Sequence, residues 1–384
     1  MGRYVARRLI YMVVVLLVVS FITFGLMHAV PGGPFDREKA LPPEIMANLN
    51  KRYHLDQPLM VQYGQYLKDV MLPKFTTTPP DNTKLEDDHL VNIKIGPVWI
   101  RWMNFGPTFS SRSRTVNDIF RQQLPISMQL GLMALAVAIT IGVPLGIIAA
   151  LKQNTIFDYL SMSVAIFGVS VPVIVLGPLL IWIFGVTLKW LPPTGWGAKP
   201  PYLLGFLPSN LGWNYFKHAI MPAVALGLGS SAILARLTRA SLLQVIREDY
   251  IRTARSKGLK ERLVITRHAL KNSLIPVVTI IGPMFAALVT GTFVTELTFG
   301  IPGMGKYFIT SITNRDYPVI MGTILLYAVF LVIANLLVDL VYAYLDPRIR
   351  CDGRGFHDES IILKKYTGGF RWCSTDSKIR KPGS

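Results

Sequence analysis

The chain has 384 residues, of which 51% are hydrophobic and 16% are charged, and its mean hydropathy is +0.40. This balance is typical of an integral membrane protein and argues against a soluble domain. The formal net charge of +18 is also typical of nucleic-acid-binding proteins, but the basic residues gather beside apolar segments, where they set membrane orientation and meet anionic lipid. Because no aromatic–basic platform accompanies the charge, we expect membrane lipid as a partner and no nucleic acid.

Apolar runs long enough to cross a hydrocarbon core of about 30 Å recur along the chain. They lie near residues 9–30, 124–151, 159–188, 218–243, 274–295 and 319–344. The first run follows an Arg-rich start, but its apolar core is longer than that of a signal peptide and no small-x-small cleavage site follows, which favours an uncleaved helix. The sequence therefore predicts an all-α integral membrane protein with six transmembrane helices.

The charges beside these runs are distributed unequally. Basic residues precede the first run and lie between the second and third, and about ten fall within 236–271. By contrast, the stretch 296–317 holds only Lys306 and Arg315 as basic residues. The positive-inside rule therefore predicts that both termini and the loop 247–276 are cytoplasmic.

The roughly ninety residues between the first two runs are too many for a structureless loop, so this extracytoplasmic insert should have a structure of its own. One amphipathic helix is expected after Pro43 and a second after Pro58. The polar stretch 74–113, with scattered Pro and Gly, gives no assignment. Thr115 is then expected to cap a short helix that ends at Arg121 and leads into the second span.

The basic loop 247–276 between the fourth and fifth spans contains a short helix with end signals on both sides. Asp249 is a suitable N-cap, Lys257 is favourable in the last turn, and Gly258 stands where a helix needs a left-handed residue. The predicted helix has about eight residues and is too short to be stable alone in water. A sequence that caps it at both ends implies that a cytoplasmic protein packs against it.

Ionisable side chains are nearly absent from the middles of the spans, where a transporter driven by protons or sodium usually places them. Arg236, Arg239 and Asp339 lie toward cytoplasmic ends and are expected to act as interfacial anchors or helix caps. The spans do hold helix-weakening residues that allow kinks and close helix contacts, including the small-xxx-small pair Gly142 and Gly146. Active transport would therefore need energy from another subunit.

No sequence pattern indicates catalysis or nucleotide binding. Residues 300–306 have the spacing of a phosphate-binding loop, but Tyr307 stands where Ser or Thr should hold magnesium, and Pro302 stiffens the loop. The chain lacks a nucleophile elbow, a zinc-protease pair and clustered carboxylates, so we expect no catalytic, cofactor-binding or metal site. Cys351 and Cys373, in the predicted tail, are expected to be free thiols.

The motifs, in their order along the chain, resemble those of the permease subunits of bacterial ABC importers for dipeptides, oligopeptides and, in some relatives, nickel. The resemblance runs from Arg7 to about Arg350. Its most specific pieces are DYIRTARSKGL from Asp249, RHALKN from Arg267 and LIP from Leu274. Supporting pieces are Val30-Pro31-Gly32, Leu55-Asp56-Gln57-Pro58, Trp190-Leu191-Pro192 with Gly195, Arg315-Asp316-Tyr317-Pro318 and the final LDPRIR.

The resemblance implies a type I ABC importer transmembrane domain in the bacterial cytoplasmic membrane. The implied partners are a homologous second permease, two cytoplasmic ABC ATPases that use ATP and magnesium, and an extracytoplasmic substrate-binding protein. The short helix is then the ATPase-coupling element, with these residues: Asp249, Tyr250, Arg252, Thr253, Ala254, Lys257 and Gly258. The broader importer pattern has an acidic residue where this chain has Arg252, so docking is carried over without a role for a carboxylate at that position. Glu248 or Asp249 is the alternative source of that carboxylate.

The resemblance also implies that a second loop lies near the exterior mouth and helps to gate it. Its residues are Glu296, Phe299, Pro302, Gly303 and Gly305. The expected organisation is a first helix in 1–30, an insert in 31–123, a five-helix core in 124–350 and a flexible cytoplasmic tail in 351–384.

The expected function is ATP-driven peptide import through a permease without an ATPase site of its own. The alternative cargo is nickel or another small solute, although the spans hold few His residues that could serve as metal ligands. A secondary transporter or channel would instead show flux without ATP or partner chains. A membrane scaffold or receptor would show docking without flux.

Overall fold

The computed structural model of the chain describes residues 2–30, 32–35, 43–53, 55–79, 87–111, 113–200, 202–203, 205–290 and 292–345. Pro31, His54, the LDPRIR motif beyond Leu345 and the tail with Cys351 and Cys373 lie outside the described residues. The expectations of a flexible tail and of free thiols therefore stay predictions.

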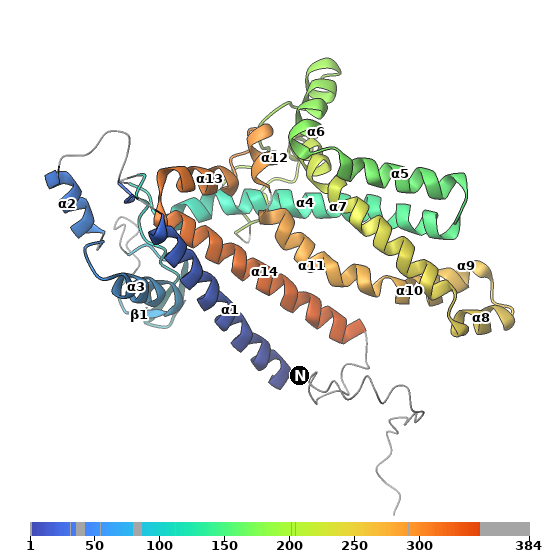
Figure 1. Cartoon of the computed structure of the whole chain (residues 1–384), viewed down its shortest axis with the longest axis horizontal. Coiled ribbons are helices and arrows are strands. Elements are labelled where there is room, and N and C mark those ends of the chain that lie inside the picture. The colour runs from blue at the N-terminus through green and yellow to red at the C-terminus, as the bar shows by residue number, and fades with distance from the viewer. Residues whose placement is uncertain are drawn as a thin grey trace, which may run out of the picture. The chain divides into compact units, whose positions relative to one another are not determined.

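Helices make up most of the described chain (Figure 1). They are α1 (Gly2–Ala29), α2 (Pro43–Arg52), α3 (Leu59–Met71), α4 (Val116–Leu151), α5 (Ile156–Ser170), α6 (Val173–Leu180), α7 (Trp213–Ile246), α8 (Asp249–Ser256), α9 (Glu261–Leu263), α10 (Leu270–Ser273), α11 (Ile275–Thr290), α12 (Phe293–Thr298), α13 (Met304–Asn314) and α14 (Tyr317–Leu345). Two π-helical segments, η1 (Ile181–Thr187) and η2 (Val264–Ala269), continue α6 and α9.

Four of these helices, α1, α4, α7 and α14, are long and apolar enough to cross a membrane. Two further pairs pass the same test together but are bent, α5 with α6–η1 by 101° and α9–α10 with α11 by 46°. The larger bend falls at Pro172, which lacks a backbone N–H and has an extended ψ of 142°. The described chain therefore holds four to six candidate spans, and each of the six predicted apolar runs overlaps one of these segments.

Helices α4 and α7 form the centre of the helical core through small residues. A Cβ at Gly142 would lie 2.4 Å from the Ser231 carbonyl oxygen, and a Cβ at Gly146 would lie 2.5 Å from that of Ala235. Because these contacts are backbone atoms, only glycine lets the two helices approach so closely. The predicted close contact at this pair of glycines is confirmed.

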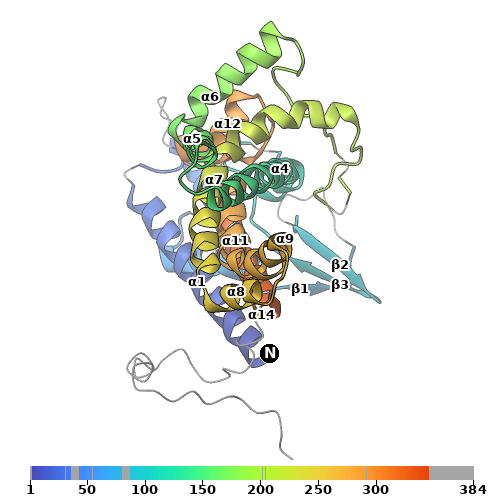
Figure 2. The ribbon, with the colours of Figure 1, turned by 90° about the vertical axis from the view of Figure 1, so that its right-hand side faces the viewer.

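The insert contains the two predicted helices, α2 and α3, and a small sheet that the sequence analysis left unassigned. The strands β1 (Lys74–Thr76), β2 (Val91–Ile95) and β3 (Val98–Trp102) pair antiparallel in the order β1-β3-β2 (Figure 2). Strands β2 and β3 meet at a tight turn in which Gly96 has a φ of 60°. The chain is thus mostly helical, with this sheet as an addition to the predicted all-α fold.

Thr115 caps α4 as predicted, in a reciprocal arrangement with Asp118. The Thr115 hydroxyl accepts from the Asp118 N–H at 3.0 Å, and the Asp118 carboxylate accepts from the Thr115 N–H at 3.3 Å. The expectation of a separate short helix ending at Arg121 is wrong, because α4 continues without a break to Leu151. The apolar surroundings of this segment keep the helix intact through Pro125.

Two sequence motifs meet where the insert reaches α14. Asp316 is 1% exposed, and its carboxylate accepts from the N–H groups of Phe109 and Ser110 at 3.1 and 3.0 Å. Beside it, Gly32 packs against the guanidinium of Arg315, and its φ of 93° is one that favours glycine. The carboxylate therefore fixes the insert to the start of the last span.

We expect Asp316→Ala to destabilise the chain by about 1–3 kcal/mol, because the partly buried Phe109 N–H loses its carboxylate acceptor and the Ser110 N–H keeps only its bond to Thr108 Oγ1. The measurement is the temperature of half-unfolding of the detergent-solubilised chain, with the exposed Asp56→Ala as the matched control. Equal unfolding temperatures for the two variants would contradict this role for Asp316.

Candidate coupling and gate sites

The predicted coupling helix is present as α8, with eight residues from Asp249 to Ser256. The assignment of Asp249 as N-cap is wrong, because Glu248 has the extended backbone of the N-cap (φ −68°, ψ 148°) and Asp249 is the first helical residue. Asp249 still complements the positive end of the helix from the first turn. The start of the helix is therefore displaced by one residue from the prediction.

Gly258 ends α8 as predicted, with a φ of 75°. The Gly258 N–H donates to the Arg255 carbonyl at 2.9 Å, and the Leu259 N–H donates to the Ala254 carbonyl at 3.4 Å. These two bonds are those of a Schellman motif, which satisfies carbonyl groups that the helix end leaves free. An L side chain at position 258 is strained by this φ alone.

Helix α8 has a buried inner face and an exposed outer face. Ile251 is 0% exposed and Ala254 is 7% exposed, and they pack against Ala150 of α4 and Leu242 of α7. The other predicted docking residues lie on the exposed surface of the helix or at its C-terminal end: Asp249, Tyr250, Arg252, Thr253, Lys257 and Gly258. Ala254 is therefore placed to hold α8 on the core, and the other six are accessible to a partner.

Polar contacts fix α8 to the second half of the loop. The Asn272 amide donates to Tyr250 Oη at 2.9 Å, and Arg255 donates to Glu261 from Nε and Nη2 at 3.1 and 2.6 Å. Asn272 belongs to the RHALKN motif, so two of the three most specific motifs of the sequence are in contact. The exposed face of α8 is thus presented on a fixed backbone.

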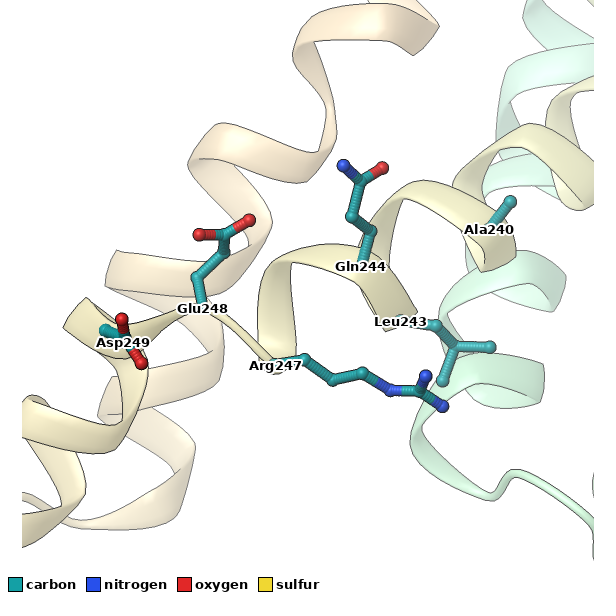
Figure 3. Close-up of a pocket in the computed structure, with 6 residues that line it drawn as sticks. All are labelled: Ala240, Leu243, Gln244, Arg247, Glu248 and Asp249. Atoms are coloured by element: carbon teal, nitrogen blue, oxygen red, sulfur yellow. The ribbon is translucent and has the colours of Figure 1, made fainter. Parts of the chain in front are cut away.

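An open cavity of about 520 Å³ lies where α7 passes into α8 (Figure 3). Its lining residues are Ala240, Leu243, Gln244, Arg247, Glu248 and Asp249. The sequence analysis missed the contribution of α7 to this surface, because Ala240 and Leu243 lie in the apolar run 218–243 and were counted only toward a span. The cavity extends the accessible surface of α8 along the end of α7.

The second candidate site surrounds Glu296 of α12, which is 1% exposed. Its Oε1 accepts from Ser127 Oγ at 2.5 Å and from Thr292 Oγ1 at 2.7 Å, and its Oε2 accepts from the Gly305 N–H at 2.8 Å. Burial raises the pKa of the Glu296 carboxyl, and these hydrogen bonds to the carboxylate oppose that shift. The Glu296 side chain therefore lies inside the protein.

The Glu296 carboxylate and the Ser127 hydroxyl together cap the start of α13. Ser127 Oγ accepts from the Met304 N–H at 2.9 Å while it donates to Glu296. Two of the N–H groups that a helix start leaves free are thus satisfied by side chains of α4 and α12. This arrangement joins α4, α12 and α13, which are distant in sequence.

The glycines of the second loop are required by close packing. A Cβ at Gly303 would lie 2.2 Å from Cδ of Glu296, and a Cβ at Gly305 would lie 2.5 Å from Cα of Phe293. Phe299 is 1% exposed in an apolar cluster, whereas Pro302 is exposed. Because the Gly305 N–H is bonded to Glu296, this loop does not present that N–H to a phosphate group.

The two candidate sites lie near opposite ends of α4. Ser127, in the N-terminal part of α4, contacts Glu296, and Ala150, near its C-terminal end, packs against Ile251 of α8. Figure 1 shows the same relation, with α13 beside the start of α4 and with α8 and α9 beside the end of α7. Within the described residues, no group of three or more His, Cys, Asp or Glu is placed to hold a metal ion.

Two known protein families match two separate segments of the chain. Residues 142–350 match the family described as "Binding-protein-dependent transport system inner membrane component", and residues 1–81 match the corresponding N-terminal family. The chain belongs to this family. Its permeases are inner membrane components, so this chain is one as well.

Individual members of the family match over nearly their whole length. The dipeptide transport system permease DppB of Bacillus subtilis is 40% identical over 92% of this chain and 100% of its own length. The oligopeptide transport system permease OppB of Salmonella typhimurium is 38% identical over 91% of this chain and 100% of its own length. A chain of the inward-facing MetNI methionine ABC transporter superposes with a TM-score of 0.45 at 16% identity, over 58% of this chain and 94% of that one.

Proposed function

We propose that the chain is the transmembrane permease subunit of an ATP-driven ABC importer for dipeptides or oligopeptides. The observation that carries this proposal is α8, a short helix with its inner face fixed to the core and its polar outer face accessible. Packing on the core already stabilises this short helix, so its polar outer face is left free to bind a partner. The full-length similarity to the dipeptide and oligopeptide permeases supports peptides as the cargo.

The architecture we assign has six spans, counting each bent pair as one, in a type I importer arrangement. An even number of spans puts both termini on one side, and the basic residues of 236–271 make that side the cytoplasm. The insert of residues 31–123 is then extracytoplasmic, where it is accessible to a substrate-binding protein. The remaining partners are a homologous second permease and two ATPases.

In the proposed mechanism, the exposed face of α8 sits in a cleft of one ATPase. Closure of the ATPase dimer on ATP displaces α8, and the buried contacts of Ile251 transmit this displacement to α4 and α7. The loop from Glu296 to Gly305, near the other end of α4, responds as an exterior gate. ATP and magnesium act in the ATPase subunits, and this chain binds no cofactor.

We expect Gly258→Leu to reduce the ATPase retained on the purified chain by roughly 5- to 30-fold, because a non-glycine residue at this φ costs about 1–2 kcal/mol. Gly258→Asn is the matched variant that tolerates positive φ and should retain most of the ATPase. Gly25→Leu, in helical backbone that faces open space among the described residues, controls for side-chain size. The measurement is quantitative co-purification from the native membrane.

The same preparation distinguishes the rival functions. Two ATPases and a second permease that depend on Gly258, with ATP-dependent uptake of labelled di- to tetrapeptides, support the proposal. Uptake of Ni²⁺ without uptake of peptides would mean that the cargo is nickel and not a peptide. A chain that purifies alone and conducts solute would be a secondary transporter or channel, and docking without flux would indicate a scaffold.

A further inference from the structure

A partly buried ion pair joins α5 and α7 close to the coupling helix. Arg239 of α7 donates to Asp158 of α5 from Nε and from Nη2, each at 2.8 Å. The Asp158 side chain is 4% exposed, and that of Arg239 is 29% exposed. The sequence analysis interpreted Arg239 as an interfacial anchor or cap, but its guanidinium is instead committed to a carboxylate 81 residues earlier.

The same carboxylate also fixes the turn between α4 and α5. Asp158 Oδ2 accepts from the Asn154 N–H at 3.0 Å, and Asn154 has a positive φ of 61°. Thr155, at the N-cap of α5, makes no side-chain bond to that helix. Arg239 therefore holds both the first turn of α5 and the turn before it.

The pair lies close to α8 along the chain. Arg239 is about 10 Å, at 1.5 Å per residue, from the end of α7 at Ile246, and α8 begins three residues later. Ile251 of α8 packs against Leu242 of α7 and Ala150 of α4. A displacement of α8 must therefore move the cytoplasmic ends of α4 and α7, and the ion pair adds α5 to this group.

On its other side, α5 leads to the second candidate site. It is followed after Pro172 by α6, where a Cβ at Gly177 would lie 2.7 Å from Cγ2 of Thr298. Leu176 shares an apolar cluster with Phe299. Helices α5 and α6 thus connect the ion pair to the end of α12, the helix that carries Glu296.

We propose that Arg239 and Asp158 are positioning residues that make α5 follow α7 when α8 moves, so that ATPase closure reaches the Glu296 loop. This inference rests on the proposed function. Elsewhere α5 and α7 meet through small apolar side chains, among them Ala165, Ala232 and Ala235. Such surfaces can slide, whereas a two-bond charged contact has one geometry and is costly to separate when it is buried.

The test is the amount of peptide transported per ATP hydrolysed by the complete transporter in proteoliposomes. We expect Arg239→Gln and Asp158→Asn each to lower this ratio at least about fivefold. Arg239→Lys keeps the charge but loses the two-bond geometry, and it should give an intermediate value. The double variant D158N/R239Q leaves no unpaired buried charge, so it should fold well, but its ratio should be lowered about as much as in the single variants because the contact between α5 and α7 is still missing.

Controls separate this inference from the proposed function. The exposed pair Lys74–Asp69, at 2.8 Å in the insert, supplies the matched variant K74Q/D69N, which should transport as the unaltered chain does. Co-purification of ATPase should be unchanged in the Arg239 and Asp158 variants, because α8 is intact. If the unaltered chain retains no ATPase, the proposed function itself fails.

Two results would overturn the inference while the proposed function stands. One is an unchanged transport-to-ATP ratio in a folded D158N/R239Q transporter. The other is loss of ATPase retention in parallel with the ratio, which would mean that the pair acts by holding α8 and not by moving α5.

Discussion

Glu296→Ala is expected to lower the free energy of unfolding by about 3–5 kcal/mol, because the substitution removes a buried carboxylate that accepts three hydrogen bonds. The Ser127 and Thr292 hydroxyls and the Gly305 N–H would all lose an acceptor. Loss of the cap also leaves the start of α13 unsatisfied. The measurement is the half-unfolding temperature and the denaturant midpoint of the solubilised chain.

An isosteric variant shows whether the charge of Glu296 or only its shape matters, and a variant at an exposed carboxylate is the control. In Glu296→Gln one oxygen keeps two of the bonds, but the amide –NH₂ would face the Gly305 N–H, so a smaller loss of about 1–3 kcal/mol is expected. Glu44→Ala removes an exposed carboxylate from α2 and is the control. An unfolding temperature for Glu296→Ala equal to that of Glu44→Ala would rule out the structural role.

Gly146→Leu is expected to be the second strongly destabilising change, with a cost of about 3 kcal/mol or more. Its Cβ would lie 2.5 Å from the Ala235 carbonyl oxygen and 2.6 Å from Cβ of Thr238. Neither atom is the far end of a flexible side chain, so α4 and α7 must separate. The measurement is the yield of monodisperse chain in size-exclusion chromatography together with its unfolding temperature.

The control for this prediction is Gly25→Leu on α1, which adds the same side chain at a helical glycine with open space among the described residues. Both variants gain about 1 kcal/mol of intrinsic helix propensity, so their difference isolates the packing clash. Gly146→Ala should give an intermediate loss, because even its single methyl group meets the backbone oxygen. If Gly146→Leu behaves as Gly25→Leu does, the close contact of α4 and α7 is not needed for folding.

Helices α4 and α7 connect the Glu296 loop to α8. Ser127 and Ala150 lie about 35 Å apart along α4, at 1.5 Å per residue, and contact the Glu296 loop and α8 respectively. Helix α7 packs on α4 between these points through Gly142 and Gly146. Rigid packing in the middle is what allows a movement at one end to reach the other.

The sequence by itself determined the elements that depend on local chemistry. The apolar runs predicted the candidate spans because their length must match the membrane, and the end signals of α8 predicted its length because caps act within one turn. Gly258 in the left-handed conformation and Thr115 as a cap followed in the same way. Periodicity likewise predicted α2 and α3.

Only the tertiary structure decided how these elements are joined, because the deciding partners are far apart in the chain. Ser127 and Glu296 are 169 residues apart, and Asp158 and Arg239 are 81 residues apart. Read locally, Glu296 and Arg239 are ordinary residues near the ends of apolar runs. The strands of the insert could not be recognised from the sequence before they were seen to pair. Whether a charged side chain is buried and paired depends on how the helices assemble. A short stretch of sequence cannot show this, because it contains only one residue of each pair.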